Sequence, residues 1–196
     1  MRISAVVLAA GQSIRMGEPK MVLPWGKTTV IGQVCSVLFQ AGLEDVLVVT
    51  GGAREAVEKA LAGMPVRTVY NPEYTRGEML SSLQIGLSSL TEQTEAALVT
   101  LGDQPQIEAW VVAALLREYA ASRADLIVPS VRMRRGHPWL VGRHLWQEIQ
   151  ALRPPETLRD FLRSHNSNIH YLPLEAESIL LDLDTPQDYR RYTQSG

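Results

Sequence analysis

Short apolar runs rich in β-branched residues alternate with stretches of helical periodicity along the first 130 residues of the chain. The runs SAVVLAA, EDVLVVTG and EAALVTLGD suit buried strands, whereas TTVIGQVCSVLFQAG and IEAWVVAALLREYAA repeat apolar residues at helical spacing. In the first of these helices Thr28 or Thr29 can cap the start and Gly42 can end it. Repeated strand and helix predict βαβ units, so we expect an α/β protein with three layers, α/β/α, and a mostly parallel, Rossmann-like sheet.

The pattern changes after residue 130, but no composition shift marks a domain boundary. The chain has 196 residues, of which 45% are hydrophobic, and this is enough for one well-packed core. HLWQEIQAL and ETLRDFLRSH look helical, SILLDLD reads as a late strand, and Thr185-Pro186 is a typical helix start. We therefore expect residues 1–196 to form a single domain, in which residues 131–196 are an extension that ends in a strand and a helix.

Charge and cysteine content exclude several classes of protein. The formal net charge is −2 and the pI is about 6.1, so no overall positive field would attract nucleic acid or an anionic membrane. The longest apolar run is far shorter than the roughly 18 residues that span a bilayer. Cys35 is the only cysteine, which excludes an internal disulfide and multi-thiolate metal sites and fits a reducing cytoplasm.

A glycine-rich loop follows the first strand, in AVVLAAGQSIRMGEPK. It is not a Walker A loop, because Gly11 and Gly17 are one position too far apart, and it lacks the second glycine of a dinucleotide fingerprint. A plain strand–helix connection with solvated cations is one interpretation. The combination of glycines with Arg15 and Lys20 favours another, in which amide N–H groups and two cations hold the phosphates of a triphosphate.

Aspartates follow two later apolar runs. Asp103 comes two positions after the end of AALVTL, where it could cap a helix that starts near Ile107 or bind magnesium at the edge that carries the glycine loop. Asp182 and Asp184 would point to one face of the late strand, so either can supply a second carboxylate. Thr185 already fills the cap position, with Asp188 as its box partner, so we favour Asp184 as the metal ligand.

The loop resembles the signature LAAGxSxRMGxxK of the molybdopterin nucleotidyltransferase family, the MobA-like NTP transferases. Four further motifs match in the family order: NPEYTRGEMLSSLQIGL, GDQP, RGHPWL and LDLDTPQDY. The resemblance implies the fold of nucleotide-diphospho-sugar transferases, with residues 1–130 as the nucleotide-binding half and 131–196 on the acceptor side. It also implies a reaction that uses a nucleoside triphosphate and releases pyrophosphate.

The resemblance also assigns roles to particular residues. It implies that Arg15, Lys20 and Asp103 are catalytic, with Arg15 on the leaving phosphates and Lys20 on the α-phosphate. The metal would be Mg²⁺, with Mn²⁺ as a substitute, on Asp103 and Asp184. The implied nucleotide-binding residues are Leu8, Ala9, Ala10, Gly11, Arg15, Lys20, Gly77 and Ser82. On the acceptor side it implies Gly136, His137 and Pro138, although a lone histidine in a turn is more often structural.

Two features of the reaction are the base of the nucleotide and the acceptor that receives it. The resemblance implies a preference for the nucleotide: family members that transfer guanylate tend to carry LAGG and those that transfer cytidylate carry AAG, so Ala10 favours CTP over GTP. The sequence has no obvious general base, which favours an acceptor that is already ionised, such as a phosphate monoester. The resemblance implies the terminal phosphate of molybdopterin and a molybdenum enzyme as recipient. However, RPPETLRDFLRSH and Gln106 depart from the family pattern on this side, so another phosphorylated acceptor, such as a sugar or polyol phosphate, stays open. A nucleotide-binding accessory protein without catalysis is a separate alternative, which the presence of Lys20 and Asp103 disfavours.

Overall fold

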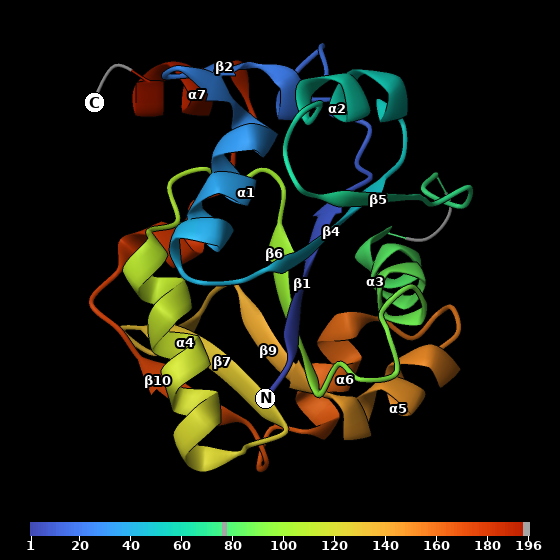
Figure 1. The fold of residues 1–196 in the computed structure, drawn as a ribbon, viewed down its shortest axis with the longest axis vertical. Helices are drawn as coiled ribbons and strands as arrows, with labels where there is room; N and C mark the ends of the chain where they lie inside the picture. The colour runs from blue at the N-terminus through green and yellow to red at the C-terminus, as the bar shows by residue number, and fades with distance from the viewer. Residues whose placement is uncertain (76–77, 194–196) are drawn as a thin grey trace.

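The computed structural model describes residues 1–75 and 78–193 of the chain. Within these residues an eight-stranded sheet has the order β10-β7-β9-β6-β1-β4-β5, and β8 pairs with β7 (Figure 1). The pairs β1/β4, β1/β6, β4/β5 and β10/β7 are parallel, while β9 and β8 run antiparallel to their neighbours. The strands are β1 (Ile3–Ala9), β4 (Asp45–Thr50), β5 (Arg67–Tyr70), β6 (Ala96–Leu101), β7 (Leu126–Val131), β8 (Arg134–Arg135), β9 (Trp139–Gly142) and β10 (His170–Pro173).

Helices cover both faces of the sheet, so the expected three-layer α/β/α fold is confirmed (Figure 1). One face packs on α1 (Val30–Gln40), α2 (Arg54–Ala60) and α4 (Ala109–Ser122), and the other on α3 (Glu78–Ser88), α5 (Trp146–Ala151) and α6 (Leu158–Ser164). Short 3-10 turns lie at Lys20–Val22, Arg143–Leu145 and Glu177–Leu180, a small ribbon pairs β2 (Pro24–Trp25) with β3 (Thr28–Thr29), and α7 (Pro186–Thr193) is the last helix.

The central strand β1 shows why the fold has two cores. Its alternate residues Ala5 and Val7 face the core under α1 and α4, whereas Val6 and Leu8 face the core under α3. Because β1, β4 and β6 are parallel, the loops that follow them meet at one edge of the sheet. In Figure 1 this edge lies at the top, beside β2 and α7.

The predicted helix caps are confirmed. Thr29 accepts a hydrogen bond from the Gly32 amide at the start of α1, and Gly42, with φ of +93°, follows its end. At α7 the Asp188 amide donates to Thr185 Oγ1, and the Thr185 amide donates to Asp188 Oδ2. This reciprocal pair is the capping box that the sequence indicates.

The prediction of a late strand in SILLDLD is wrong. Residues Glu177–Leu180 form a 3-10 turn, and residues 181–184 have no regular structure. Their backbone groups bond to loops instead of a strand ladder: the Leu183 amide donates to the Asp103 carbonyl, and the Ile179 carbonyl accepts from the His137 amide. The late strands are β9 and β10, which the sequence did not indicate. No helix in the described part of the chain is long and apolar enough to cross a bilayer.

Candidate active site

The glycine loop folds back on itself and delivers a lysine to the edge of the sheet. Ser13, with φ of +54°, begins a turn in which the Met16 and Gly17 amides both donate to the Ser13 carbonyl. Gly17 has a φ of +77°, which a glycine adopts without strain. The Ser13 hydroxyl then accepts a hydrogen bond from the Lys20 amide at 3.1 Å. Lys20 therefore starts its short turn with its side chain directed inward.

Lys20 joins two aspartates that are far apart in the sequence. Its Nζ lies 2.5 Å from Asp103 Oδ2 and 3.2 Å from Asp184 Oδ1. Arg15 Nη2 lies 2.9 Å from the other oxygen of Asp184. The structure thus brings together all three residues predicted to be catalytic and the predicted second metal ligand.

This cluster differs in exposure from one end to the other. The side chains of Lys20 and Asp103 are 11% and 15% exposed, that of Asp184 34% and that of Arg15 69%. Burial alone would lower the pKa of Lys20, but the charges and hydrogen bonds of Asp103 and Asp184 outweigh it and raise the pKa. Lys20 is therefore a fully charged, buried cation, while Arg15 extends into solvent.

Asp182 takes no part in the contacts with Lys20 or Arg15. Its Oδ1 accepts a hydrogen bond of 2.7 Å from Gln104 Nε2. Burial, followed by the nearby charge of Asp103, raises the pKa of Asp182. Of the two candidates, Asp184 is the one whose carboxylate shares a contact with Asp103.

The paired carboxylates fit a divalent metal. Oxygens of Asp103 and Asp184 converge on Lys20 Nζ, so the two carboxylates already stabilise a positive charge at this position. Among the described residues no group of three or more histidine, cysteine, aspartate or glutamate side chains could hold a metal ion. Magnesium commonly takes only one or two carboxylates and completes its shell with water and substrate phosphates. Asp103 does not cap α4, whose first turn has no side-chain cap.

The residues of the LAAG stretch lie at the end of β1. Leu8, Ala9 and Ala10 are buried, and Gly11 is exposed. Ala10 packs against Gly51 after β4, where an added Cβ would lie 2.3 Å from the Ala10 oxygen and 2.8 Å from its Cβ. The close approach of these two loops fixes the position of the Ala10 methyl.

Ser82 of α3 is buried, with 3% of its surface exposed. Its hydroxyl accepts a hydrogen bond of 2.9 Å from Asn71 Nδ2, which also donates to Ser81 at 3.0 Å. Asn71 is fully buried just after β5, and its own Oδ1 accepts from the Glu73 amide. The sequence analysis missed Asn71, although it opens the NPEY motif. The predicted residue Gly77 lies outside the described residues.

A shallow hollow lies on the other side of the glycine loop, away from β6. It is lined by Gln12, Ser13, Ile14, Gly17, Glu18, Pro19, Gly52, Ala53 and Tyr74. A Cβ on Gly52 would lie 3.1 Å from the Tyr74 ring, so this glycine keeps the hollow open beside the tyrosine. The sequence analysis missed Gly52 and Tyr74, because only the fold brings the ends of β4 and β5 beside the loop.

The predicted acceptor-side residues lie between β8 and β9. Gly136 and Pro138 are buried, and the partly buried ring of His137 stacks on Trp139 with centroids 4.5 Å apart. Burial lowers the pKa of His137 to about 4, so the ring is neutral at neutral pH. The acceptor role of these three residues stays a prediction. Among the described residues, the Gln106 amide is buried without a hydrogen-bond partner.

A glycine loop, two cations and converging carboxylates at the carboxyl edge of a mostly parallel sheet define a nucleotidyltransferase. The chain belongs to the MobA-like NTP transferase family, whose model matches residues 5–169. This confirms the resemblance seen in the five sequence motifs.

Three comparisons illustrate the relationship. The chain is 32% identical over 200 residues to the molybdenum cofactor cytidylyltransferase of Escherichia coli (strain K12), covering 98% of each chain. It is 27% identical to nicotine blue oxidoreductase of Paenarthrobacter nicotinovorans, covering 96% of this chain and 95% of the relative. The solved structure of Rv0371C from Mycobacterium tuberculosis, a complex with manganese, is 28% identical, superposes with a TM-score of 0.84 and is covered completely, as is this chain.

Proposed function

We propose that this nucleotidyltransferase moves CMP from CTP to the terminal phosphate of molybdenum cofactor and releases pyrophosphate, with Mg²⁺ or Mn²⁺ as its metal. The observation that carries the proposal is the cluster of Arg15, Lys20, Asp103 and Asp184 beside the glycine loop. The relative named as a cytidylyltransferase and the manganese complex of the structural neighbour support the choice of nucleotide and metal.

The charges of the cluster suit a triphosphate. A divalent metal held by Asp103 and Asp184 would neutralise phosphate charge and orient the triphosphate. Lys20, whose pKa is raised, carries its proton throughout and donates hydrogen bonds to α-phosphate oxygens as negative charge builds there. Arg15 is exposed and bonded to Asp184 alone among the described residues, so it can turn to the β- and γ-phosphates that leave as pyrophosphate.

The acceptor needs no strong base in this scheme. An oxygen of its phosphate attacks the α-phosphorus, and the bond from that phosphorus to the β-phosphate oxygen breaks. A phosphate monoester is mostly dianionic at neutral pH because its second pKa is about 6. His137, with a pKa of about 4, would be a weak base in any case. The unpartnered Gln106 amide supports a polar acceptor, because binding would satisfy groups that are costly to leave unpaired.

The choice of CTP rests on Ala10. Its methyl is held in place against Gly51, and it takes up room that a glycine would leave for the larger guanine. Ser82, set in place by Asn71, is the proposed polar contact of the base. Residues 1–130 would supply the nucleotide side and residues 131–196 the acceptor side.

A pyrophosphate-release assay tests the proposal. The protein is incubated with Mg²⁺, molybdenum cofactor and either CTP or GTP. We expect release with CTP, and loss of this release in Asp103→Ala but not in Glu44→Ala, an exposed acid at the opposite edge of the sheet. Release that requires a sugar or polyol phosphate instead would assign another acceptor. Nucleotide binding without release under all conditions would indicate a non-catalytic accessory protein.

A further inference from the structure

The segment that carries Asp184 has no regular secondary structure to support it. Residues 177–180 form a single 3-10 turn, and residues 181–184 follow without helix or strand. At its start the Ser178 hydroxyl donates to Glu108. Near its end Gln104 bonds to Asp182, and the Leu183 amide donates to the Asp103 carbonyl at 3.0 Å. The position of Asp184 therefore depends on contacts with other parts of the chain.

The Gly-His-Pro turn makes a further contact with this segment. The His137 amide donates a hydrogen bond of 3.0 Å to the Ile179 carbonyl. A Cβ on Gly136 would lie 2.4 Å from that carbonyl oxygen, 2.5 Å from Ile179 Cγ1 and 2.7 Å from Ile179 Cβ. Only glycine allows the turn to approach the segment this closely.

The turn itself is fixed to the sheet. The Gly136 amide donates to the Pro129 carbonyl of β7 at 3.0 Å, and Trp139 Nε1 of β9 donates to the Gly136 carbonyl at 2.8 Å. Gly136 and His137 thus hold Ile179 against the sheet. From Ile179 the chain reaches Leu183, which is fully buried, and then Asp184.

We propose that Gly136 and His137 are positioning residues that set the place of the Asp184 carboxylate for the metal. The inference rests on the proposed metal role of Asp103 and Asp184. A methyl at residue 136 would force the Ile179 carbonyl to move by about 1 Å to reach an ordinary contact distance, and catalytic groups tolerate displacements of only about 0.5 Å. The Gly-His-Pro motif would then act on the metal through the segment 177–184.

Manganese binding in the absence of acceptor tests this role. Electron paramagnetic resonance measures free Mn²⁺ during titration of the protein with Mn²⁺ and CTP, so contacts with an acceptor cannot influence the result. We expect Gly136→Ala to weaken Mn²⁺ binding by about 10- to 100-fold, the usual cost of disturbing the support of a metal ligand. Asp184→Ala should also weaken it, and the double variant should bind no more weakly than Asp184→Ala alone.

Gly142→Ala is the matched control. Gly142 ends β9, and a Cβ there would lie 2.8 Å from Asp125 Oδ1. This substitution therefore introduces a similar clash, but with Asp125 instead of the segment 177–184. We expect its Mn²⁺ affinity to stay within about twofold of wild type, a change of less than about 0.5 kcal/mol. Equal weakening in both glycine variants would show a general effect on the fold and overturn the proposal.

The remaining outcomes distinguish failure of the metal site from failure of the positioning role. If Asp184→Ala leaves Mn²⁺ binding unchanged, the proposed metal site is wrong. If Asp184→Ala weakens binding and Gly136→Ala does not, the metal site stands and the positioning role is overturned. Should Gly136→Ala fail to fold, Ile179→Val shortens the side chain that packs against Gly136 and adds no clash. If this variant weakens Mn²⁺ binding in the wild-type background but causes no further weakening in the Asp184→Ala background, the proposal is supported. Unchanged Mn²⁺ binding in the wild-type background refutes it.

Discussion

Replacing Lys20 by methionine removes the buried cation and keeps a side chain of similar length. In the metal-free protein this leaves Asp103, only 15% exposed, without its ion-pair partner at 2.5 Å. Removal of one member of a buried ion pair costs about 3–5 kcal/mol, because the other charge stays buried. Asp184 is 34% exposed and keeps Arg15 as a partner, so we expect a loss near the lower limit, about 3 kcal/mol.

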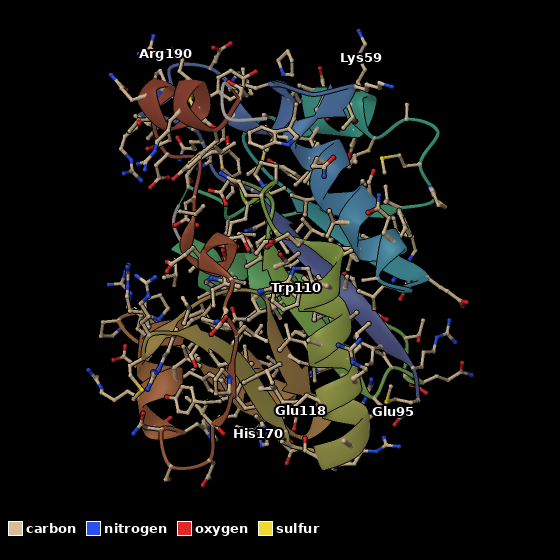
Figure 2. All side chains as sticks on the ribbon, turned by 90° about the vertical axis from the view of Figure 1, so that its left-hand side faces the viewer. Lys59, Glu95, Trp110, Glu118, His170 and Arg190 are labelled. Atoms are coloured by element: carbon tan, nitrogen blue, oxygen red, sulfur yellow. The ribbon has the colours of Figure 1, made fainter. Side chains whose placement is uncertain are left out.

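A loss of this size is easily measured. For a domain of this length, about 3 kcal/mol lowers Tm by about 6–12 °C. Thermal and urea unfolding of metal-free protein at pH 7 give the value. Lys59→Met is the control, because Lys59 is exposed on α2 (Figure 2), and such surface substitutions change stability by less than about 0.5 kcal/mol.

Divalent metal should reverse part of the effect. Because Mn²⁺ can supply the positive charge that Asp103 and Asp184 have lost, it should raise the Tm of Lys20→Met more than that of wild type. The kcat of the variant should still fall by about 10²- to 10³-fold, since the charge on the α-phosphate loses its donor. A metal-free Lys20→Met protein as stable as wild type would refute this reasoning.

Three further predictions concern neighbouring residues. Arg15→Ala should change the free energy of unfolding by less than about 0.5 kcal/mol from wild type, because the ion pair of Arg15 is exposed. It should lower kcat/KM for CTP by about 10²-fold in the pyrophosphate assay. Asp182→Asn should be more stable than wild type in urea at pH 7, and the difference should shrink to zero as the pH falls below about 3.8. Because the folded pKa of Asp182 is raised, its ionisation costs folding free energy that builds up as the pH rises from the unfolded pKa to the folded one. Ala10→Gly should lower the CTP/GTP ratio of kcat/KM, and an unchanged ratio would contradict the explanation of base choice.

Much of the fold was predictable because its strongest signals are local. β1, β4 and β6 are continuous apolar runs, and the caps of α1 and α7 involve residues three positions apart. The short strands β9 and β10 lack such a signal, since β9 follows a basic turn and β10 exposes alternate residues. β10 is tied to α4 by the contact of 2.8 Å between His170 Nε2 and Glu118 Oε1 (Figure 2), which no local pattern indicates.

In the candidate site, too, residues with a local sequence signal were predictable and residues that depend on distant contacts were not. Lys20 and Asp103 were found because each follows a recognisable motif. The alternating leucines and aspartates of SILLDLD suggested a strand, yet that segment is shaped by contacts with loops from elsewhere in the chain. Asn71, Tyr74 and Gln104 lie inside the NPEY and GDQP motifs, but they act through neighbours that only the fold brings together, so the motifs alone did not reveal their contacts.

The most direct measurement is an anomalous difference map from crystals grown with Mn²⁺ and CTP. The account predicts one strong manganese peak bonded to carboxylate oxygens of both Asp103 and Asp184, with Lys20 turned from the aspartates to the α-phosphate. A manganese ion bound elsewhere, with Lys20 still paired to both aspartates beneath the nucleotide, would contradict it.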